Sequence, residues 1–145
     1  MARIRKYVVD SSVAFKWVVP EADTQKAVRL RDDFRSAVHE LPAPDVFPIE
    51  LSHALTRAER QGRIAVSLAV GLLMDVMTTS PHLFPSLPLL LRACEISSRT
   101  RVGVYDCLYV ALAEREGCKL LTADDRLVRT LQPTLPFITS LSSLP

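Results

Sequence analysis

Four acidic residues stand at separate points of the chain, each where it could serve one reaction centre. They are Asp10, Glu50, Asp106 and Asp124. Three of them fall where an apolar segment gives way to a predicted helix. Carboxylates gathered at one point cannot all stay charged unless a cation lies between them. The pattern therefore favours a divalent-metal site, and its expected use is metal-assisted cleavage of a phosphodiester bond.

The expected cation is Mg²⁺ or Mn²⁺, because both prefer oxygen ligands in octahedral geometry. Such an ion lowers the pKa of a bound water, and a second ion can stabilise the leaving oxygen. Without a cation, at least one of the carboxyls should keep a proton near neutral pH, because its neighbours are anionic. Ser12 and Thr122 add hydroxyls that can hold a carboxylate or a water in place. No side chain is expected to act as a covalent nucleophile.

The elements that must position these groups alternate between short apolar strands and helices. Strands are predicted at 7–9, 82–84, 118–122 and 136–139. Helices are predicted at 13–19 (capped by Ser11 and Ser12), 22–39, from 45 or 47 to 62, 66–79, 88–99, 104–116 and 124–131. Residues 41–44 are predicted to form a loop, and 140–145 a frayed tail. This alternation predicts a three-layer α/β/α sandwich around a central parallel sheet.

In an open sheet of this kind, ligands bind beyond the carboxyl ends of the strands. Asp10 directly follows the first strand, and Asp124 follows the 118–122 strand by one residue. Asp106 opens the helix before that strand. Glu50 instead lies inside a helix, at the edge of an apolar stripe and next to the small Ala54, from where it can reach a cleft. The four acids converge only if the chain folds into this sheet.

Composition limits the class of protein. The 145 residues fit one domain, 1–145, and 48% hydrophobic with 23% charged residues is a globular composition. The net charge of +2 is too small to indicate a nucleic-acid binder by itself. Three cysteines without C-x-x-C spacing suit a reducing cytoplasm rather than a disulfide framework or a zinc site. No apolar run approaches the ~20 residues that span a bilayer, so we expect a cytoplasmic protein with no membrane partner.

Structural roles for the same acids compete with a metal site. An Asp at a helix start is often only an N-cap, and Glu50 near the start of its helix could stabilise the helix dipole or pair with Arg57. The chain would then be a non-catalytic binding module. A receiver-like phosphotransfer domain is a further possibility, but it expects adjacent acids near the first strand and a lysine after a late strand. Here Asp10 stands alone, and Lys119 precedes its strand.

Four segments, 8–13, 48–55, 105–113 and 120–127, resemble the PIN-domain ribonucleases, most closely the VapC-type toxins of bacterial and archaeal toxin–antitoxin pairs. The resemblance implies an α/β/α fold, a Mg²⁺ or Mn²⁺ site and cleavage of single-stranded RNA. It assigns the acidic set to Asp10, Glu50, Asp106 and Asp124, with Ser12 and Thr122 as the accompanying hydroxyls. Asp125 is the alternative to Asp124, and spacing from Thr122 favours Asp124.

The same resemblance implies a homodimer and a VapB-like antitoxin that masks the site. The apolar segments 68–77 and 88–96 are candidates for those surfaces, or ordinary core faces. Lys16, Arg57, Arg99 and Arg101 are candidate RNA contacts, or solvated helix faces. A housekeeping PIN nuclease that processes RNA is the alternative function.

Overall fold

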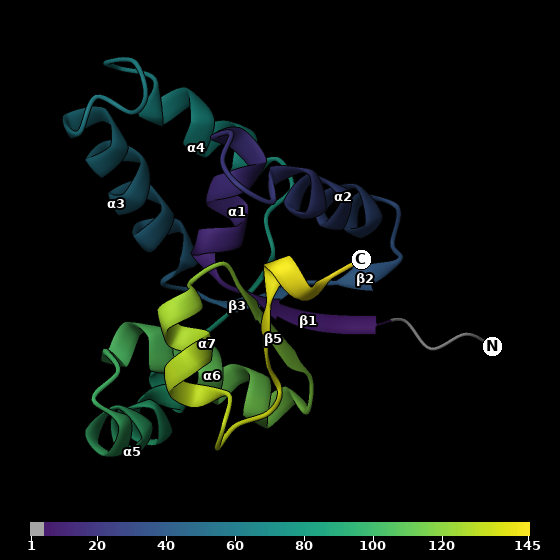
Figure 1. Ribbon diagram of the computed structural model, residues 1–145, viewed down its shortest axis with the longest axis vertical. Coiled ribbons are helices and arrows are strands. Elements are labelled where there is room, and N and C mark those ends of the chain that lie inside the picture. Colours follow the sequence, from purple (N-terminus) through teal and green to yellow (C-terminus); the bar gives the residue numbers. More distant parts are fainter. Residues whose placement is uncertain (1–4) are drawn as a thin grey trace.

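A central sheet of four parallel strands lies between two layers of helices in the computed structural model, which describes residues 5–145 (Figure 1). The strands are β1 (Arg5–Val9), β2 (His39–Glu40), β5 (Lys119–Thr122) and β6 (Ile138–Ser140), in the order β2-β1-β5-β6. The predicted α/β/α architecture with a parallel sheet is confirmed.

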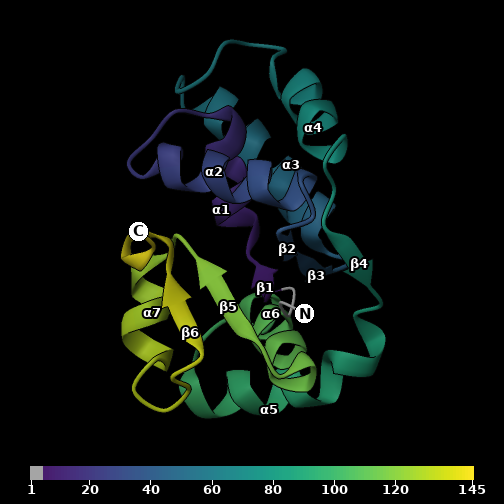
Figure 2. The ribbon, with the colours of Figure 1, turned by 90° about the vertical axis from the view of Figure 1, so that its right-hand side faces the viewer.

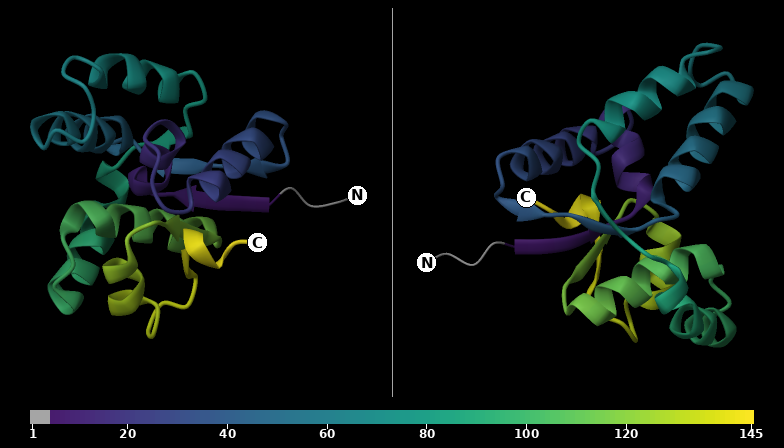
Figure 3. Two further views of the ribbon diagram at one scale, coloured as in Figure 1. Left: turned by 45° about the horizontal axis from the view of Figure 1, so that its top comes forward. Right: turned by 180° about the vertical axis from the view of Figure 1, so that it is seen from behind.

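Helices cover both faces of this sheet (Figure 2). On one side lie α1 (Ser11–Val18), α2 (Thr24–Arg35), α3 (Phe47–Arg60) and α4 (Ala69–Met77), and on the other α5 (Leu90–Thr100), α6 (Val104–Glu116) and α7 (Asp125–Leu131). Two short 3-10 helices, η1 (Leu87–Leu89) and η2 (Leu141–Ser143), complete the helices of residues 5–145. Helices α3 and α4 form a hairpin that extends away from the sheet (Figure 3).

Strand register brings the ends of β1 and β5 level with each other. Val9 pairs with Leu121, and the Asp10 amide donates to the Leu121 carbonyl at 3.0 Å. The apolar residues Val8 and Val9 of β1 and Leu120 and Leu121 of β5 are fully buried, because helices cover both faces of the sheet. Helix α6 is buried without a break from Cys107 to Ala113, which is typical of a helix in the middle of a core. Side chains at the ends of β1 and β5 and at the start of α6 are therefore held by rigid elements.

The predicted loop at 41–44 is wrong in part, because β3 (Pro42–Pro44) pairs in parallel with β4 (His82–Phe84), the strand expected at 82–84. The Leu41 carbonyl accepts from the His82 amide at 2.9 Å, and the Asp45 amide donates to the Phe84 carbonyl at 2.8 Å. On the β3 side these bonds are made by Leu41 and Asp45. Pro42 and Pro44 therefore occupy strand positions at which no backbone donor is needed.

The predicted helix at 22–39 ends early. Helix α2 stops at Arg35, and Ala37 adopts a left-handed φ of 59° that turns the chain back toward the sheet. His39 and Glu40 then pair with Arg5 and Lys6 of β1 as strand β2, which the sequence pattern did not indicate. Two residues are too few to show a strand period.

The predicted frayed tail at 140–145 is also wrong. Ser140 ends β6, and the side chain of Leu141 is buried in the core. The Lys26 ammonium donates to the Ser142 carbonyl, and Arg29 donates to the Pro145 carbonyl at 3.1 Å. One buried leucine and two contacts from α2 thus anchor a segment whose serine-rich composition suggests disorder. Within residues 5–145, no helix combines the length and apolar character needed to span a bilayer.

A buried arginine ties together the helices on the α1 side. Arg31 of α2 is 6% exposed, and its guanidinium donates to the Thr79 hydroxyl at 2.7 Å and to the Asp75 carbonyl at 2.6 Å. It also pairs with the half-exposed Asp75 carboxylate at 3.0 Å and lies 5.1 Å from the ring centre of Trp17. One side chain therefore links α2 to the end of α4 and to α1.

We predict that Arg31→Met lowers the free energy of unfolding by about 2–4 kcal/mol, because it removes a buried side chain's hydrogen bonds to Thr79 and to the Asp75 carbonyl together with its ion pair to Asp75. Chemical denaturation measures this change. Arg99→Met is the matched control, since Arg99 is exposed on α5 and makes no ion pair within residues 5–145, and it should change stability by less than about 0.5 kcal/mol. Equal effects of the two substitutions would contradict the role given to Arg31.

Candidate active site

Asp10 is the most buried of the four acids, at 5% exposure. It stands between the end of β1 and the start of α1. Its Oδ2 accepts from the Ser12 hydroxyl at 2.7 Å and from the Thr122 hydroxyl at 2.8 Å. The serine belongs to α1 and the threonine ends β5, so one carboxylate oxygen joins the two strand ends and the following helix.

Each hydroxyl has one proton, and both protons are used on Asp10. The 3.4 Å approach of Ser12 Oγ to Thr122 Oγ1 is therefore a contact between two acceptors rather than a third hydrogen bond. Instead, Ser12 Oγ accepts from the Ala123 amide at 3.0 Å, and Thr122 Oγ1 accepts from the Asp124 amide at 3.0 Å. The backbone that leads to Asp124 is thus fixed by the same two side chains that fix Asp10.

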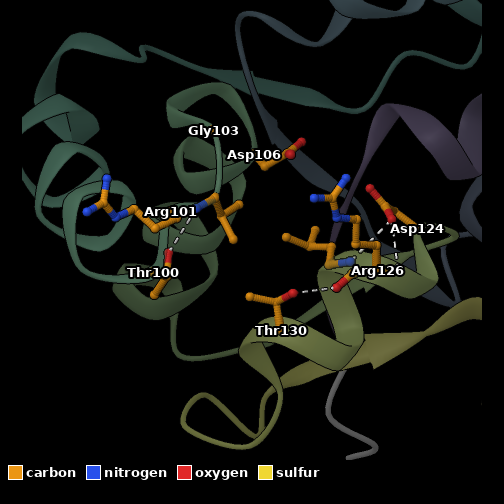
Figure 4. Close-up of a pocket in the computed structure, with 9 residues that line it drawn as sticks. Thr100, Arg101, Gly103, Asp106, Asp124, Arg126 and Thr130 are labelled. Atoms are coloured by element: carbon orange, nitrogen blue, oxygen red, sulfur yellow. Dashed lines mark hydrogen bonds between the residues drawn. The ribbon is translucent and has the colours of Figure 1, made fainter.

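Asp106 and Asp124 both line a hollow of about 430 Å³ between the start of α6 and α7, here called the α6–α7 hollow (Figure 4). The same two acids, together with Asp10, line a second and wider hollow between α1 and α3, the α1–α3 hollow. The two hollows therefore share Asp106 and Asp124. Three of the four predicted acids therefore line the α1–α3 hollow.

Glu50 approaches this group from α3. It lines a neighbouring hollow with Ser11, and the charges of Asp10 and Asp106 act on its carboxylate. Glu50 Oε1 is buried without a hydrogen-bond partner among the described residues. The Tyr109 hydroxyl is close enough to lower the pKa of Glu50, yet it too lacks a partner within hydrogen-bonding distance. We regard that contact as loose, which leaves an oxygen of Glu50 free for another ligand.

The electrostatics of the site disfavour four free carboxylates. Burial raises the pKa of Asp10, although the hydrogen bonds from Ser12 and Thr122 oppose this shift. Burial, reinforced by Asp10 and Asp106, raises the pKa of Glu50 to about 7. Burial, reinforced by Asp10 and Asp124, raises the pKa of Asp106 to about 6. With a pKa of about 7, Glu50 is partly protonated near neutral pH, and the largest cause is burial rather than the anionic neighbours that the sequence suggested.

This donor set fits a hard divalent cation, because it consists of carboxylate oxygens with one buried oxygen still unpartnered. Within residues 5–145, no three Asp, Glu, His or Cys side chains are already closed around a metal-sized point. Mg²⁺ and Mn²⁺ tolerate this, because they commonly bind through a few carboxylates and keep several waters. Asp10, Glu50, Asp106 and Asp124 are the side chains that would hold such an ion.

The competing structural roles are only partly realised. Asp124 does cap α7, since its Oδ1 accepts from the amides of Arg126 and Leu127 at 3.0 and 3.2 Å, but it lines both hollows as well. The expected caps Ser11 and Ser12 are wrong. The N-cap position of α1 is Asp10, without a side-chain cap bond, and Ser12 donates to Asp10 instead.

Glu50 does lie in the first turn of α3, where an acid stabilises the helix dipole, but the other roles considered for Glu50 and Asp125 are not taken. Among the described residues, Glu50 makes no ion pair with Arg57. Asp125 is exposed and does not line either hollow, whereas Asp124 lines both. Of the candidate RNA contacts, Lys16 and Arg57 line the α1–α3 hollow and Arg101 lines the α6–α7 hollow, while Arg99 lines neither.

Two residues near the acids were not predicted from the sequence. Tyr109 lies three residues after Asp106 on α6 and is buried, with its hydroxyl near Glu50. Arg126 lies two residues after Asp124 and lines the α6–α7 hollow. The helical spacing of three residues from Asp106 was a usable signal for Tyr109. For Arg126 the only signal was its place in the first turn of a helix that begins at an acidic residue.

Comparison with known proteins agrees with this fold. The family model for the PIN domain matches residues 7–131. The chain is 37% identical over 122 residues to Ribonuclease VapC3 of Mycobacterium tuberculosis (strain H37Rv), covering 84% of this chain and 85% of that protein. It is 32% identical over 126 residues to Ribonuclease VapC3 of Pyrobaculum aerophilum, covering 84% and 92%. The chain therefore belongs to the PIN-domain family.

Solved structures share the fold. The crystal structure of PAE2754 from Pyrobaculum aerophilum superposes with a TM-score of 0.71 at 20% identity, covering 98% of this chain and 88% of that chain. The structure of VapBC2 from Rickettsia felis bound to a DNA fragment from their promoter gives a TM-score of 0.59 at 11% identity, covering 93% and 96%. At these identities the likeness concerns the fold alone.

We predict that Mn²⁺ stabilises the protein more as pH rises. The folded-state pKa values of Glu50 (about 7) and Asp106 (about 6) lie above their ordinary values of 4.5 and 3.8. The folded state therefore binds more protons than the unfolded state in this range, and metal-free stability falls as pH rises from about 4 to about 7. A cation binds the ionised carboxylates, so its benefit grows over the same interval.

Thermal unfolding with and without saturating Mn²⁺ measures this effect. We expect an increase in Tm of about 5–10 °C near pH 8 and a much smaller one near pH 5. Glu50→Gln should reduce the pH dependence, because it removes one of the titrating groups. An increase in Tm that is the same at both pH values would contradict the predicted linkage.

Proposed function

We propose that the chain is a Mg²⁺- or Mn²⁺-dependent endoribonuclease that cleaves single-stranded RNA, and that it is the toxin of a toxin–antitoxin pair. The observation that carries the proposal is the convergence of Asp10, Glu50, Asp106 and Asp124 from distant parts of one chain. The names of the relatives, which are ribonucleases of the VapC type at up to 37% identity, support the same reaction. The whole chain, residues 1–145, would act as one catalytic domain.

The acidic side chains would have different roles in this reaction. When bound, the divalent ion would lower the pKa of water and neutralise charge on the phosphate. Asp10, fixed by Ser12 and Thr122, would be the most rigid ligand. Glu50 and Asp106 change protonation most easily near neutral pH, so they must lose protons before the ion can bind.

Exposed apolar side chains on two separate surfaces support the binding of two protein partners. Leu87 and Leu91 are 81% and 82% exposed beside the partly exposed Leu83 and Leu90, and we assign this β4–α5 patch to a second copy of the chain. Val70 and Met74 on α4 are exposed on the α3–α4 hairpin. Because α3 lines the α1–α3 hollow, a VapB-like antitoxin segment bound along this hairpin would lie close enough to cover the acids.

We predict that Asp10→Asn lowers the rate of Mn²⁺-dependent RNA cleavage by at least about 100-fold, because it removes the charge of the best-ordered ligand. The Asn side chain keeps an oxygen that can accept from Ser12 and Thr122, so the variant should fold. Cleavage of a labelled single-stranded RNA measures the rate, and circular dichroism checks the fold. Asp125→Asn is the matched control and should keep nearly full activity. An unchanged rate in Asp10→Asn would refute the assignment.

We predict that Leu91→Glu converts a homodimer into a monomer, because it places a charge in a buried apolar contact. Light scattering coupled to gel filtration measures the mass. Val70→Glu makes the same chemical change at a similarly exposed position on α4 and should leave the dimer intact. A native protein that is already monomeric would exclude the proposed homodimer.

A further inference from the structure

We propose that Arg126 and Arg57 bind RNA phosphates on opposite sides of the scissile bond, so that the strand crosses the acids from one hollow to the other. This inference rests on the proposed ribonuclease function and adds the path of its substrate. It follows from the arrangement of the two hollows, which meet at Asp106 and Asp124.

Two cations, Arg101 and Arg126, line the α6–α7 hollow, and Arg126 is the one that faces the acids. Its side chain points to the side of the hollow where Asp106 and Asp124 lie, whereas that of Arg101 points away from them (Figure 4). The Arg126 amide is bound to Asp124 Oδ1 at 3.0 Å, which fixes the start of the side chain. Among residues 5–145, no carboxylate forms an ion pair with the Arg126 guanidinium, so its charge and its donors remain free for a ligand.

Arg57 is the corresponding cation of the α1–α3 hollow. Two other cations line this hollow, but both are already paired: Lys16 with Glu21 at 3.4 Å, and Arg63 with the same carboxylate. Arg57 has no ion pair within the described part of the chain. Glu21 holds both of these side chains but neutralises only one of their two charges, so Arg57 is the cation of this hollow whose guanidinium has no ion-pair partner within residues 5–145.

A guanidinium that is not paired suits a phosphate, because its planar fork can donate two parallel hydrogen bonds to phosphate oxygens. The acids alone would repel a polyanion, and the two arginines offset this repulsion on either side of them. A strand held at both hollows places the phosphate between the two contacts over Asp106 and Asp124. This path requires a further phosphate on each side of the cleaved bond, which an internal bond of an RNA strand provides.

Binding of a labelled single-stranded RNA to the Asp10→Asn variant tests the contacts without cleavage. Adding Arg126→Gln or Arg57→Gln should each weaken binding by about tenfold. Each should also reduce the slope of log K against log salt concentration by about 0.7, the value for one phosphate contact on a single strand. Arg129→Gln is the matched control, because Arg129 is exposed on the same helix as Arg126 but lines neither hollow, and it should do neither.

Cleavage of shortened substrates by the otherwise native chain tests the two-sided path. When nucleotides are removed from one side of the cleaved bond, only one of the two arginine variants should still lower kcat/KM. When they are removed from the other side, only the other variant should. If both variants respond alike to both truncations, or behave as Arg129→Gln does, the proposed path is overturned.

The two proposals fail in different ways. If the native chain with Mn²⁺ neither cleaves nor binds RNA, the proposed function fails and the inference with it. If the native chain cleaves RNA and both arginine variants match Arg129→Gln, the inference alone fails.

Discussion

The structure depends on one buried carboxylate. Asp10 sits at the point where β1 ends, and burying its charge there is costly unless hydrogen bonds replace water. Ser12 and Thr122 supply those bonds to a single oxygen, and each uses its only proton in doing so. The same two hydroxyls then accept the amides of Ala123 and Asp124. Satisfying one charge thus sets the register of the strand ends and the course of the chain toward α7.

The other acids are placed by helices rather than by hydrogen bonds between them. The buried run of α6 leaves Asp106 and Tyr109 little freedom, and α3 brings Glu50 in from the opposite side. None of these carboxylates neutralises another, so their proximity raises the pKa of Glu50 and Asp106 beyond the effect of burial. Repulsion between these carboxylates lowers the stability of the metal-free fold, and a bound divalent cation would relieve this repulsion.

The sequence predicts correctly the parts of the fold that have a clear hydrophobic pattern. Apolar runs predicted β1 and β5, and the positions of Asp10 and Asp124 follow from where those runs stop. The strand at Pro42–Pro44 was missed because prolines oppose strand structure unless their register avoids the ladder, and register is a tertiary property. Leu141 illustrates the same limit, since one leucine in a polar tail carries no periodicity. Likewise, whether Arg57, Lys16 or Arg126 is free to bind a ligand depends on ion pairs that only the folded chain reveals.

The distribution of charge and apolar surface separates two kinds of recognition. Around the acids, cations that pair with Glu21 are held in place, while Arg57 and Arg126 stay free within the described residues. The strongly exposed leucines instead lie on the β4–α5 patch, away from the residues that line the two hollows. The free arginines near the acids attract a polyanion such as RNA, whereas the apolar β4–α5 patch does not stabilise its binding. A protein partner is stabilised most by burying apolar surface. On the proposed function, RNA and a protein partner would therefore use different surfaces of one small domain, except along α3, where the hairpin and the α1–α3 hollow meet.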